Sequence, residues 1–254
     1  MVNVINTVLI TQARTGSTRL PNKVLKTINE QELLKIHLER ISKAKLVDSI
    51  IVATTNNNDD DIIETLVKEW GYNCFRGSEH DVLDRFYQAV INLSPEWVVR
   101  VTSDCPLLDH NIIDGVISLA KVNDLDYCSN ILTEAFPDGQ DVEIFKFSAL
   151  KKAWNNTKLK SDREHVTPYI RNNSDIKGGS LFKAMNFPCV EYFNDIRMTV
   201  DELNDYELIK KLVSSLGVSK SWMEYTRFII EQGLGEINKN IIRNEGYIQS
   251  LKND

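Results

Sequence analysis

The chain has 254 residues, of which 42% are hydrophobic and 26% charged, so it can bury a core as one large domain or two small ones. Its formal net charge of −6 argues against bulk binding to nucleic acid, which needs clustered Lys and Arg. No apolar run approaches the roughly eighteen residues of a membrane helix, and the N-terminus lacks a secretory pattern. The four cysteines and four histidines have no metal-ligand spacing, so we expect reduced thiols and a cytoplasmic location.

Strand and helix patterns alternate through the first half of the chain. Buried strands are predicted at 7–11, 49–54, 73–75 and 97–102, and helices at about 34–41, 59–70, 81–91 and 112–120. This alternation with short connections predicts an α/β fold in which a mostly parallel central sheet carries helices on both faces.

The second half is less regular. Strands are expected at 142–147 and 196–200, and a helix at 162–171. The segment 155–186 is rich in Asn, Lys and Ser, and we expect it to form a lobe outside the sheet. The segment 204–254 has mainly helical patterns. No repeat or linker divides the chain, so we predict a single domain over 1–254 with an elaborated second half.

The stretch ARTGSTRLPNK, residues 13–23, directly follows the first predicted strand. It gathers Arg14, Arg19, Lys23, three hydroxyl groups and Gly16 into one loop. Backbone N–H groups and fixed positive charges can converge there on a polyphosphate. The alternative is a solvated basic turn, which is disfavoured because Gly, Ser, Thr and Pro separate the charges. The loop matches neither Walker A nor GxGxxG, which points away from P-loop hydrolases and Rossmann dehydrogenases.

Polar residues also follow the other three predicted strands of the first half. They are Thr54-Thr55-Asn56, Arg76-Gly77-Ser78 and Ser103-Asp104. In open α/β sheets, ligands bind beyond the carboxyl ends of the strands. We therefore predict that all four loops open onto one pocket containing a phosphate loop, hydroxyl and amide groups, and a carboxylate.

Two aspartates, Asp104 and Asp201, each stand at the end of a predicted strand. Carboxylates beside a basic phosphate loop suit a magnesium ion bridging to a nucleoside triphosphate. Asp104 could instead cap the next helix, but Asp109 is the better-placed cap. For Asp201 the alternative stays open that it and Asp205 simply start the next helix.

The loop at 13–23 resembles the AR-x-GS-x-R-x-P-x-K signature of the CMP-sugar-acid synthetases, the sialate and 3-deoxy-octulosonate cytidylyltransferases. More closely, the chain resembles the branch named after spore coat polysaccharide biosynthesis protein F. The further blocks that carry this resemblance, in the same order, are VATTNN, FRGSEHDVLDRF, VVRVTSDCPLLD, FPDGQDVEIF, SDREHVTPYIR and RMTVDELNDYEL. The resemblance covers nearly the whole length. It implies a nucleotide-diphospho-sugar transferase (GT-A-like) fold, CTP, Mg²⁺, release of pyrophosphate, and a homodimer.

The resemblance also implies roles for individual residues. The triphosphate-binding positions are Arg14, Ser17, Arg19 and Lys23, and the magnesium-binding positions are Asp104 and Asp201. The nucleotide-binding set further includes Ala13, Gly16, Thr54, Arg76, Gly77, Ser78 and Ser103. Ser103 stands where Gly is common in the family, and as a small residue it still permits close approach of the backbone. We expect Arg14, Lys23 and Asp104 to be the catalytic residues.

The residues that bind the acceptor are predicted less directly. The candidates are Gln140, Glu143, Arg163, His165 and Arg197. Arg163 or Arg197 would be the bidentate partner of an acceptor carboxylate, and His165 could act as a base, although a lone His is more often structural. The alternative for 162–165 is an ordinary capped helical turn. We expect residues 134–195 to form the acceptor-binding or dimerisation lobe.

The sequence thus predicts a magnesium-dependent cytidylyltransferase that acts on a sugar acid or related surface-glycan precursor. One alternative is a nucleotidyltransferase that uses a sugar phosphate or another NTP, which the low glycine content of the loop disfavours. The other is a non-catalytic nucleotide-binding sensor or scaffold, which the complete set of Arg14, Lys23, Asp104 and Asp201 disfavours.

Overall fold

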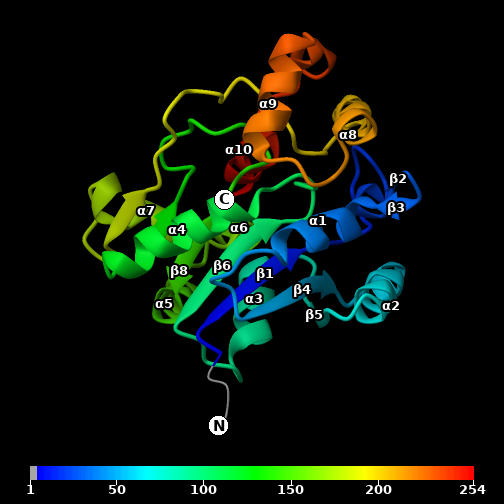
Figure 1. Cartoon of the computed structure of the whole chain (residues 1–254). Helices are drawn as coiled ribbons and strands as arrows, with labels where there is room; N and C mark the ends of the chain where they lie inside the picture. Colours follow the sequence, from blue (N-terminus) through cyan, green and yellow to red (C-terminus); the bar gives the residue numbers. More distant parts are fainter. Residues whose placement is uncertain (1–4) are drawn as a thin grey trace.

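The computed structural model describes residues 5–254, and its centre is a seven-stranded sheet of order β5-β4-β1-β6-β8-β7-β9 (Figure 1). The strands of this sheet are β1 (Thr7–Gln12), β4 (Ser49–Thr55), β5 (Asn73–Gly77), β6 (Trp97–Thr102), β7 (Tyr127–Ser129), β8 (Glu143–Lys146) and β9 (Ala184–Asn186). All neighbouring pairs are parallel except the two that β8 makes with β6 and β7. The predicted mostly parallel α/β sheet is confirmed. Strands β2 (Thr27–Ile28) and β3 (Gln31–Glu32) form a separate short hairpin.

Helices cover both faces of the sheet (Figure 1). The α-helices are α1 (Leu33–Ile41), α2 (Asp61–Glu69), α3 (Val82–Val90), α4 (His110–Val122), α5 (Phe147–Asn156), α6 (Lys160–His165), α7 (Pro168–Asn172), α8 (Leu203–Leu216), α9 (Trp222–Glu231) and α10 (Glu245–Ser250). The 3₁₀ turns are η1 (Lys23–Leu25), η2 (Asn58–Asp60), η3 (Asp175–Lys177), η4 (Leu234–Ile237) and η5 (Leu251–Asn253). Within residues 5–254 we find no helix that combines the length and the apolar character of a membrane span.

Successive residues of each strand point to opposite faces and enter two separate cores. Leu9 and Val99 pack with α1, α2 and α4 on one face. Val8 and Val98 pack with α3, α5 and α7 on the other. Because β1 is buried on both faces, it is a continuous apolar run, which is why the sequence pattern locates it.

The C-terminal helices do not form a separate body. A third core joins Leu33 of α1 to Leu208 of α8 and Tyr225 of α9, and it includes Met198 and Val200 of the preceding segment. This packing fixes the chain on both sides of Asp201. Helices α8, α9 and α10 lie in this part of the chain.

The expectation that 155–186 lies outside the sheet is wrong. Its last three residues form β9, which pairs in parallel with β7. Val166, Ile170 and Phe182 are buried in the core beneath α3 and α5. The polar composition of the segment conceals these few apolar residues, which dock it onto the sheet.

Two further predicted elements differ from the observed ones. The helix expected at 162–171 is divided into α6 and α7, because Val166 has a φ of 72°, a value that lies outside the right-handed helical region. The strand expected at 196–200 is an extended segment with a single bridge, between Arg197 and Asp138. The segment 196–200 is therefore not part of a regular ladder, and its polar side chains lie close to the ends of the central strands.

Candidate active site

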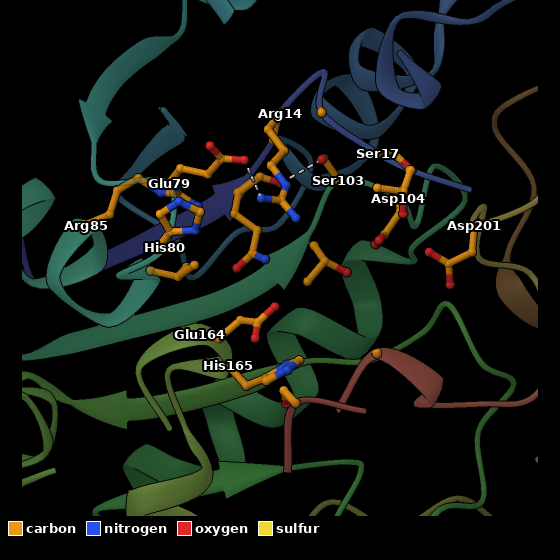
Figure 2. A pocket seen from close by; sticks show the side chains of 18 of the residues that line it. Arg14, Ser17, Glu79, His80, Arg85, Ser103, Asp104, Glu164, His165 and Asp201 are labelled. Atoms are coloured by element: carbon orange, nitrogen blue, oxygen red, sulfur yellow. Dashed lines mark hydrogen bonds and ion pairs between the residues drawn. The ribbon is translucent and has the colours of Figure 1, made fainter. Parts of the chain in front are cut away.

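A pocket of about 1140 Å³ opens at the carboxyl ends of β1 and β6. One wall is the loop after β1, with Arg14, Ser17 and Lys23, and the loop after β6, with Ser103 and Asp104. Glu164 and His165 of α6 lie across from them, and Asp201 closes one end (Figure 2). Residues of the loop after β5 and of α10 complete the lining. Of the four strand-end loops predicted to share one pocket, those after β1, β5 and β6 contribute to its lining, and the loop after β4 does not.

Lys23 lies at the centre of the charged part of this pocket. Its Nζ donates to Asp104 Oδ2 at 2.9 Å and to Asp201 Oδ1 at 2.8 Å. Burial acts to lower the pKa of Lys23, but the two carboxylates outweigh it and the pKa is raised. Burial likewise acts to raise the pKa of Asp104, yet Lys23 and a hydrogen bond from Thr102 hold that pKa well below its ordinary value. Lys23 is therefore an ammonium cation that bridges two carboxylates.

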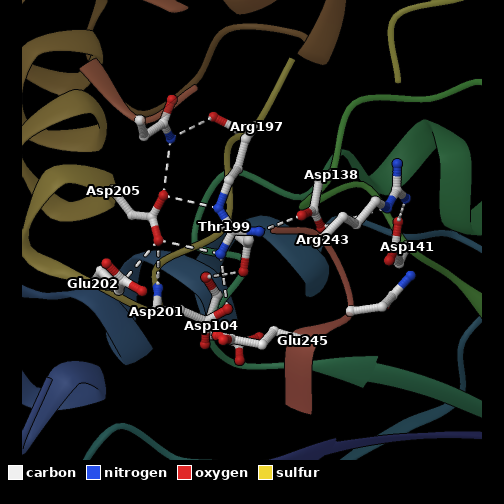
Figure 3. A network of polar contacts seen from close by, with 12 residues as sticks. Asp104, Asp138, Asp141, Arg197, Thr199, Asp201, Glu202, Asp205, Arg243 and Glu245 are labelled. Atoms are coloured by element: carbon white, nitrogen blue, oxygen red, sulfur yellow. Dashed lines mark hydrogen bonds and ion pairs between the residues drawn. The ribbon is translucent and has the colours of Figure 1, made fainter. Parts of the chain in front are cut away.

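The chain holds the two aspartates side by side although they are distant in sequence. The backbone oxygen of Asp104 accepts hydrogen bonds from Val200 N at 2.8 Å and Thr199 Oγ1 at 3.2 Å. On the other side, Arg197 Nη2 donates to Asp201 Oδ2 at 2.8 Å (Figure 3). Asp201 thus has one oxygen facing Lys23 and the other fixed by Arg197.

Arg197 is itself held by a network of carboxylates. It contacts Asp138 at 2.5 Å and Asp205 at 2.9 Å in addition to Asp201 (Figure 3). Burial acts to lower the pKa of Arg197, but hydrogen bonding to Asp205 and the surrounding negative charge raise it above its ordinary value. Gly139 allows its own backbone to lie close to the backbone of Met198, next to Arg197. Its φ is +101°, and a Cβ at this position would lie 2.6 Å from the Met198 carbonyl carbon. Arg197 therefore positions Asp201.

The donor atoms of this centre fit a magnesium ion that is shared with a phosphate. Among residues 5–254 no group of three or more His, Cys, Asp or Glu side chains forms a ready cage. Mg²⁺ usually takes one or two carboxylates together with substrate phosphates rather than an all-protein cage. Asp104 and Asp201, which converge on the one Lys23 Nζ, supply two such carboxylates beside a basic loop.

A buried carboxylate that sequence analysis missed holds the phosphate loop. Asp60 Oδ1 accepts hydrogen bonds from Thr15 N and Thr15 Oγ1, both at 2.7 Å, and Asp60 Oδ2 accepts one from Thr55 Oγ1. Asp60 is 2% exposed. In the sequence it stands within a run of three aspartates, which is typical of the acidic start of a helix. The hydrogen bonds show that it also fixes the loop after β1.

Most of the predicted nucleotide-binding residues line the pocket. They are Ala13, Arg14, Gly16, Ser17, Arg19, Lys23 and Ser103. Arg14 Nη1 contacts Glu79 at 2.9 Å, and Arg19 contacts Asp201 at 3.1 Å. Ser103 Oγ donates to the backbone oxygen of Gln12 at 2.6 Å, so the residue that replaces glycine ties the end of β6 to the end of β1.

Four predicted residues do not line the pocket: Thr54, Arg76, Gly77 and Ser78. Arg76 turns outward to Asp61 at 2.5 Å and Glu64 at 3.1 Å, because β5 is the edge strand beside α2. Thr54 is fully buried. The loop after β5 instead reaches the pocket one residue later, through Glu79, His80 and Asp81.

The predicted acceptor-binding residues divide in the same way. Arg163 and His165 line the pocket. Glu143 is buried and accepts from Arg100 at 2.6 Å and Tyr127 Oη at 2.6 Å. Gln140 is buried and accepts from the backbone N of Asp109 at 3.0 Å. Arg197 pairs with three aspartates, and like Glu143 and Gln140 it is not part of the pocket lining.

The two alternatives about helix starts are also decided by geometry. Asp109 caps α4, where its side chain accepts from Asn111 N at 2.9 Å, so Asp104 is not that cap. Asp205 does serve the start of α8, in a capping box with Glu202. Asp201 lies before that helix and faces the pocket.

Unpartnered polar atoms mark where a ligand would complete the pocket. Within the described part of the chain, the buried atoms Gln12 Oε1, Arg85 Nε and His165 Nε2 have no hydrogen-bond partner, and all three residues line the pocket. Burial, together with the positive charge of Arg100 and Arg171, lowers the pKa of His165 to about 4. Gln12 and Arg85 were not singled out in the sequence, because nothing in their spacing distinguishes them.

Known proteins resemble this chain in sequence. A family model described as cytidylyltransferase matches residues 8–239. An uncharacterized protein of Methanocaldococcus jannaschii is 45% identical over 80% of this chain and 81% of its own length. The spore coat polysaccharide biosynthesis protein SpsF of Bacillus subtilis is 33% identical over 82% of this chain and 86% of its own.

A solved structure has the same fold as this chain. The structure of a cytidylyltransferase from Leptospira borgpetersenii superposes with a TM-score of 0.85 at 32% identity, covering 94% of this chain and 98% of that one. The match to the family model spans the phosphate loop, Asp104 and Asp201. The chain therefore belongs to the cytidylyltransferase family and is a nucleotidyltransferase.

Proposed function

We propose that the chain transfers CMP from CTP to a sugar acid, or a related surface-glycan precursor, with Mg²⁺ and with release of pyrophosphate. The observation that carries this proposal is the bridge from Lys23 to Asp104 and Asp201 beside the basic loop at 13–23. The resemblance to CMP-sugar-acid synthetases supports the choice of CTP and of a sugar acid.

The proposed reaction is an in-line substitution at the α-phosphorus of CTP. A bond forms between an acceptor oxygen and the α-phosphorus, and the bond from that phosphorus to the bridging oxygen of pyrophosphate breaks. Pyrophosphate leaves with the bonding electron pair, and the acceptor hydroxyl gives up its proton to water. Such transfers depend chiefly on positioning and on neutralising charge. Arg14, Arg19 and Lys23 would supply the fixed positive charge along the triphosphate.

Asp104 and Asp201 would hold the magnesium ion. When bound, Mg²⁺ neutralises phosphate charge and orients the reacting groups. The chain's own part is to aim both carboxylates at one point and to keep Asp104 ionised. Lys23 serves this by lowering the pKa of Asp104, and Arg197 by fixing the second oxygen of Asp201.

The acceptor would lie on the side of the pocket formed by α6 and the residues before it. Lys158, Lys160 and Arg163 line this side, so an acceptor carboxylate would meet positive charge there. Arg197 is excluded from that role by its three aspartate partners. A pKa of about 4 makes His165 neutral at pH 7, so we assign it a hydrogen bond to the acceptor rather than the role of a strong base.

The experiment is an acceptor-dependent assay of pyrophosphate release. The protein is incubated with Mg²⁺ and each of CTP, UTP, ATP and GTP, and with sialic acids, 3-deoxy-octulosonate and sugar 1-phosphates. We expect release with CTP and a sugar acid. Release only with a sugar phosphate or another NTP would replace the proposal by the first alternative, and nucleotide binding without release by the second.

Matched variants show whether the activity resides in this pocket. Asp104→Asn should abolish release, because it removes a carboxylate from the Lys23 bridge. Asp124→Asn makes the same change at an exposed residue that pairs with Lys146, and it should leave release unchanged. Equal activity in the two variants would contradict the proposed site.

A further inference from the structure

The C-terminal segment, residues 243–254, forms part of the pocket although the family model matches only residues 8–239. Glu245, Gly246, Gln249 and Ser250 line the cavity. The segment is attached at both ends. Arg243 Nη2 contacts Asp141 at 2.9 Å, and Asp254 accepts from Ser161 N at 2.8 Å.

Several carboxylates surround the guanidinium of Arg19. Its Nη1 donates to Glu245 Oε2 at 2.9 Å, and Asp201 lies 3.1 Å away. Glu202 is a further carboxylate at 3.8 Å. Arg19 is thus surrounded by negative charge, although the loop that carries it is the one proposed to bind a triphosphate.

A triphosphate and Glu245 cannot both use Arg19 without repulsion. Like charges that share one cation disfavour each other, and within residues 5–254 no cation other than Arg19 forms an ion pair with Glu245. Glu245 is also about one-third exposed, so water can take the place of its ion pair with Arg19 at little cost. The carboxylate can therefore be displaced by an arriving triphosphate.

The same segment touches the opposite side of the pocket through Tyr247. Its ring meets the His165 ring edge-on, with centroids 5.0 Å apart, and the Arg171 guanidinium lies 5.2 Å from its centroid. Glu245 and Tyr247 are two residues apart on α10, a short helix of six residues. A shift that frees Arg19 would therefore also move Tyr247 relative to His165, on the side where the acceptor would lie.

We propose that the C-terminal segment is a gate across the pocket: Glu245 pairs with Arg19, and a nucleoside triphosphate displaces it and so opens the acceptor side. This rests on the proposed function insofar as a triphosphate binds along 13–23. It gives the reaction an order, because the acceptor gains access to His165 only after the nucleotide has released Glu245.

The test compares Glu245→Gln with the wild type and with a control, Glu236→Gln. Both variants remove one negative charge, but Glu236 pairs only with Lys239 on the surface. Binding of CTP and of inorganic tripolyphosphate is measured by calorimetry, and hydrogen exchange of peptides covering 244–252 is followed with and without ligand. Since an exposed ion pair is a weak competitor, we expect about 1.5-fold to fivefold tighter binding of both ligands by Glu245→Gln.

The exchange data give an independent readout. In the wild type we expect CTP to speed exchange in 244–252, and in Glu245→Gln we expect fast exchange before CTP is added. Unchanged affinity in the variant, or slower exchange on adding CTP, would overturn the gate and make the segment a fixed wall or a closing cap. Failure of the wild type to bind CTP at all would instead refute the proposed function.

Discussion

Replacing Lys23 by Met keeps much of the side chain's apolar length but removes the ammonium group that joins Asp104 to Asp201. Lys23 is 14% exposed, and the two carboxylates are 26% and 22% exposed, so the pairs are only partly screened by water. Hydrogen bonds to charged groups contribute about 1.5–3 kcal/mol each. Two such contacts, discounted for partial exposure, predict that the free energy of unfolding falls by about 2–3 kcal/mol in a metal-free buffer.

The same variant should respond to divalent cations more strongly than the wild type. A cation can take the place of the missing ammonium between the two carboxylates, and binding to the native state raises its stability. Turnover should still fall by about 10²-fold or more, because a charge that stabilises the transition state is gone.

The assay is urea unfolding in EDTA and in MgCl₂, together with pyrophosphate release. Lys239→Met is the control, because Lys239 forms an exposed pair with Glu236 and its loss should change neither stability nor turnover. The reasoning would be refuted if Lys23→Met matched the wild type in stability without metal and retained its turnover.

Three other changes have expected outcomes. Asp60→Asn should lower the free energy of unfolding by about 2–3 kcal/mol, because a buried carboxylate that accepts hydrogen bonds from Thr15 is lost. The variant should also raise KM for the nucleotide more than it lowers kcat. An unchanged KM would argue against the positioning role of Asp60. Arg197→Met should weaken Mg²⁺-dependent turnover by freeing one Asp201 oxygen, which a titration of rate against Mg²⁺ would reveal as a higher half-saturating concentration. Burial lowers the pKa of His37 to about 4, so below pH 6.5 the unfolded chain binds a proton that the folded chain does not, and stability should decline by up to about 3 kcal/mol between pH 6.5 and pH 4; His37→Gln, unfolded in urea at both pH values, should lose part of that slope, and an identical slope would contradict the assignment.

The parts of the fold that could be predicted are those where burial leaves a periodic pattern. Val8-Leu9-Ile10 is apolar because β1 is covered on both faces, and α4 begins at the predicted cap Asp109. The docking of 155–186 could not be predicted, because it depends on isolated residues such as Phe182. The same holds for 196–200, where tertiary contacts with Asp138 replace a ladder.

The candidate site was predictable where charge and strand ends coincide, as at Lys23 and Asp104. The site was not predictable where a residue's role depends on the direction in which its side chain points. Arg76 follows the predicted strand at 73–75, but it lies within the observed edge strand β5 and turns toward Asp61. Nor does a residue type reveal whether a carboxylate faces a ligand or a loop: Asp60 holds Thr15, whereas Asp201 faces the pocket.

The most direct test of the account follows the α-phosphorus of CTP. The protein is incubated with Mg²⁺, a sugar acid and CTP labelled at that phosphorus, and the products are separated. If the chain transfers CMP to a sugar acid, the label moves into a CMP–sugar acid conjugate, and unlabelled pyrophosphate is released in equal amount. Label that remains in CTP with every sugar acid, or that appears in CDP or free CMP without a conjugate, would contradict it.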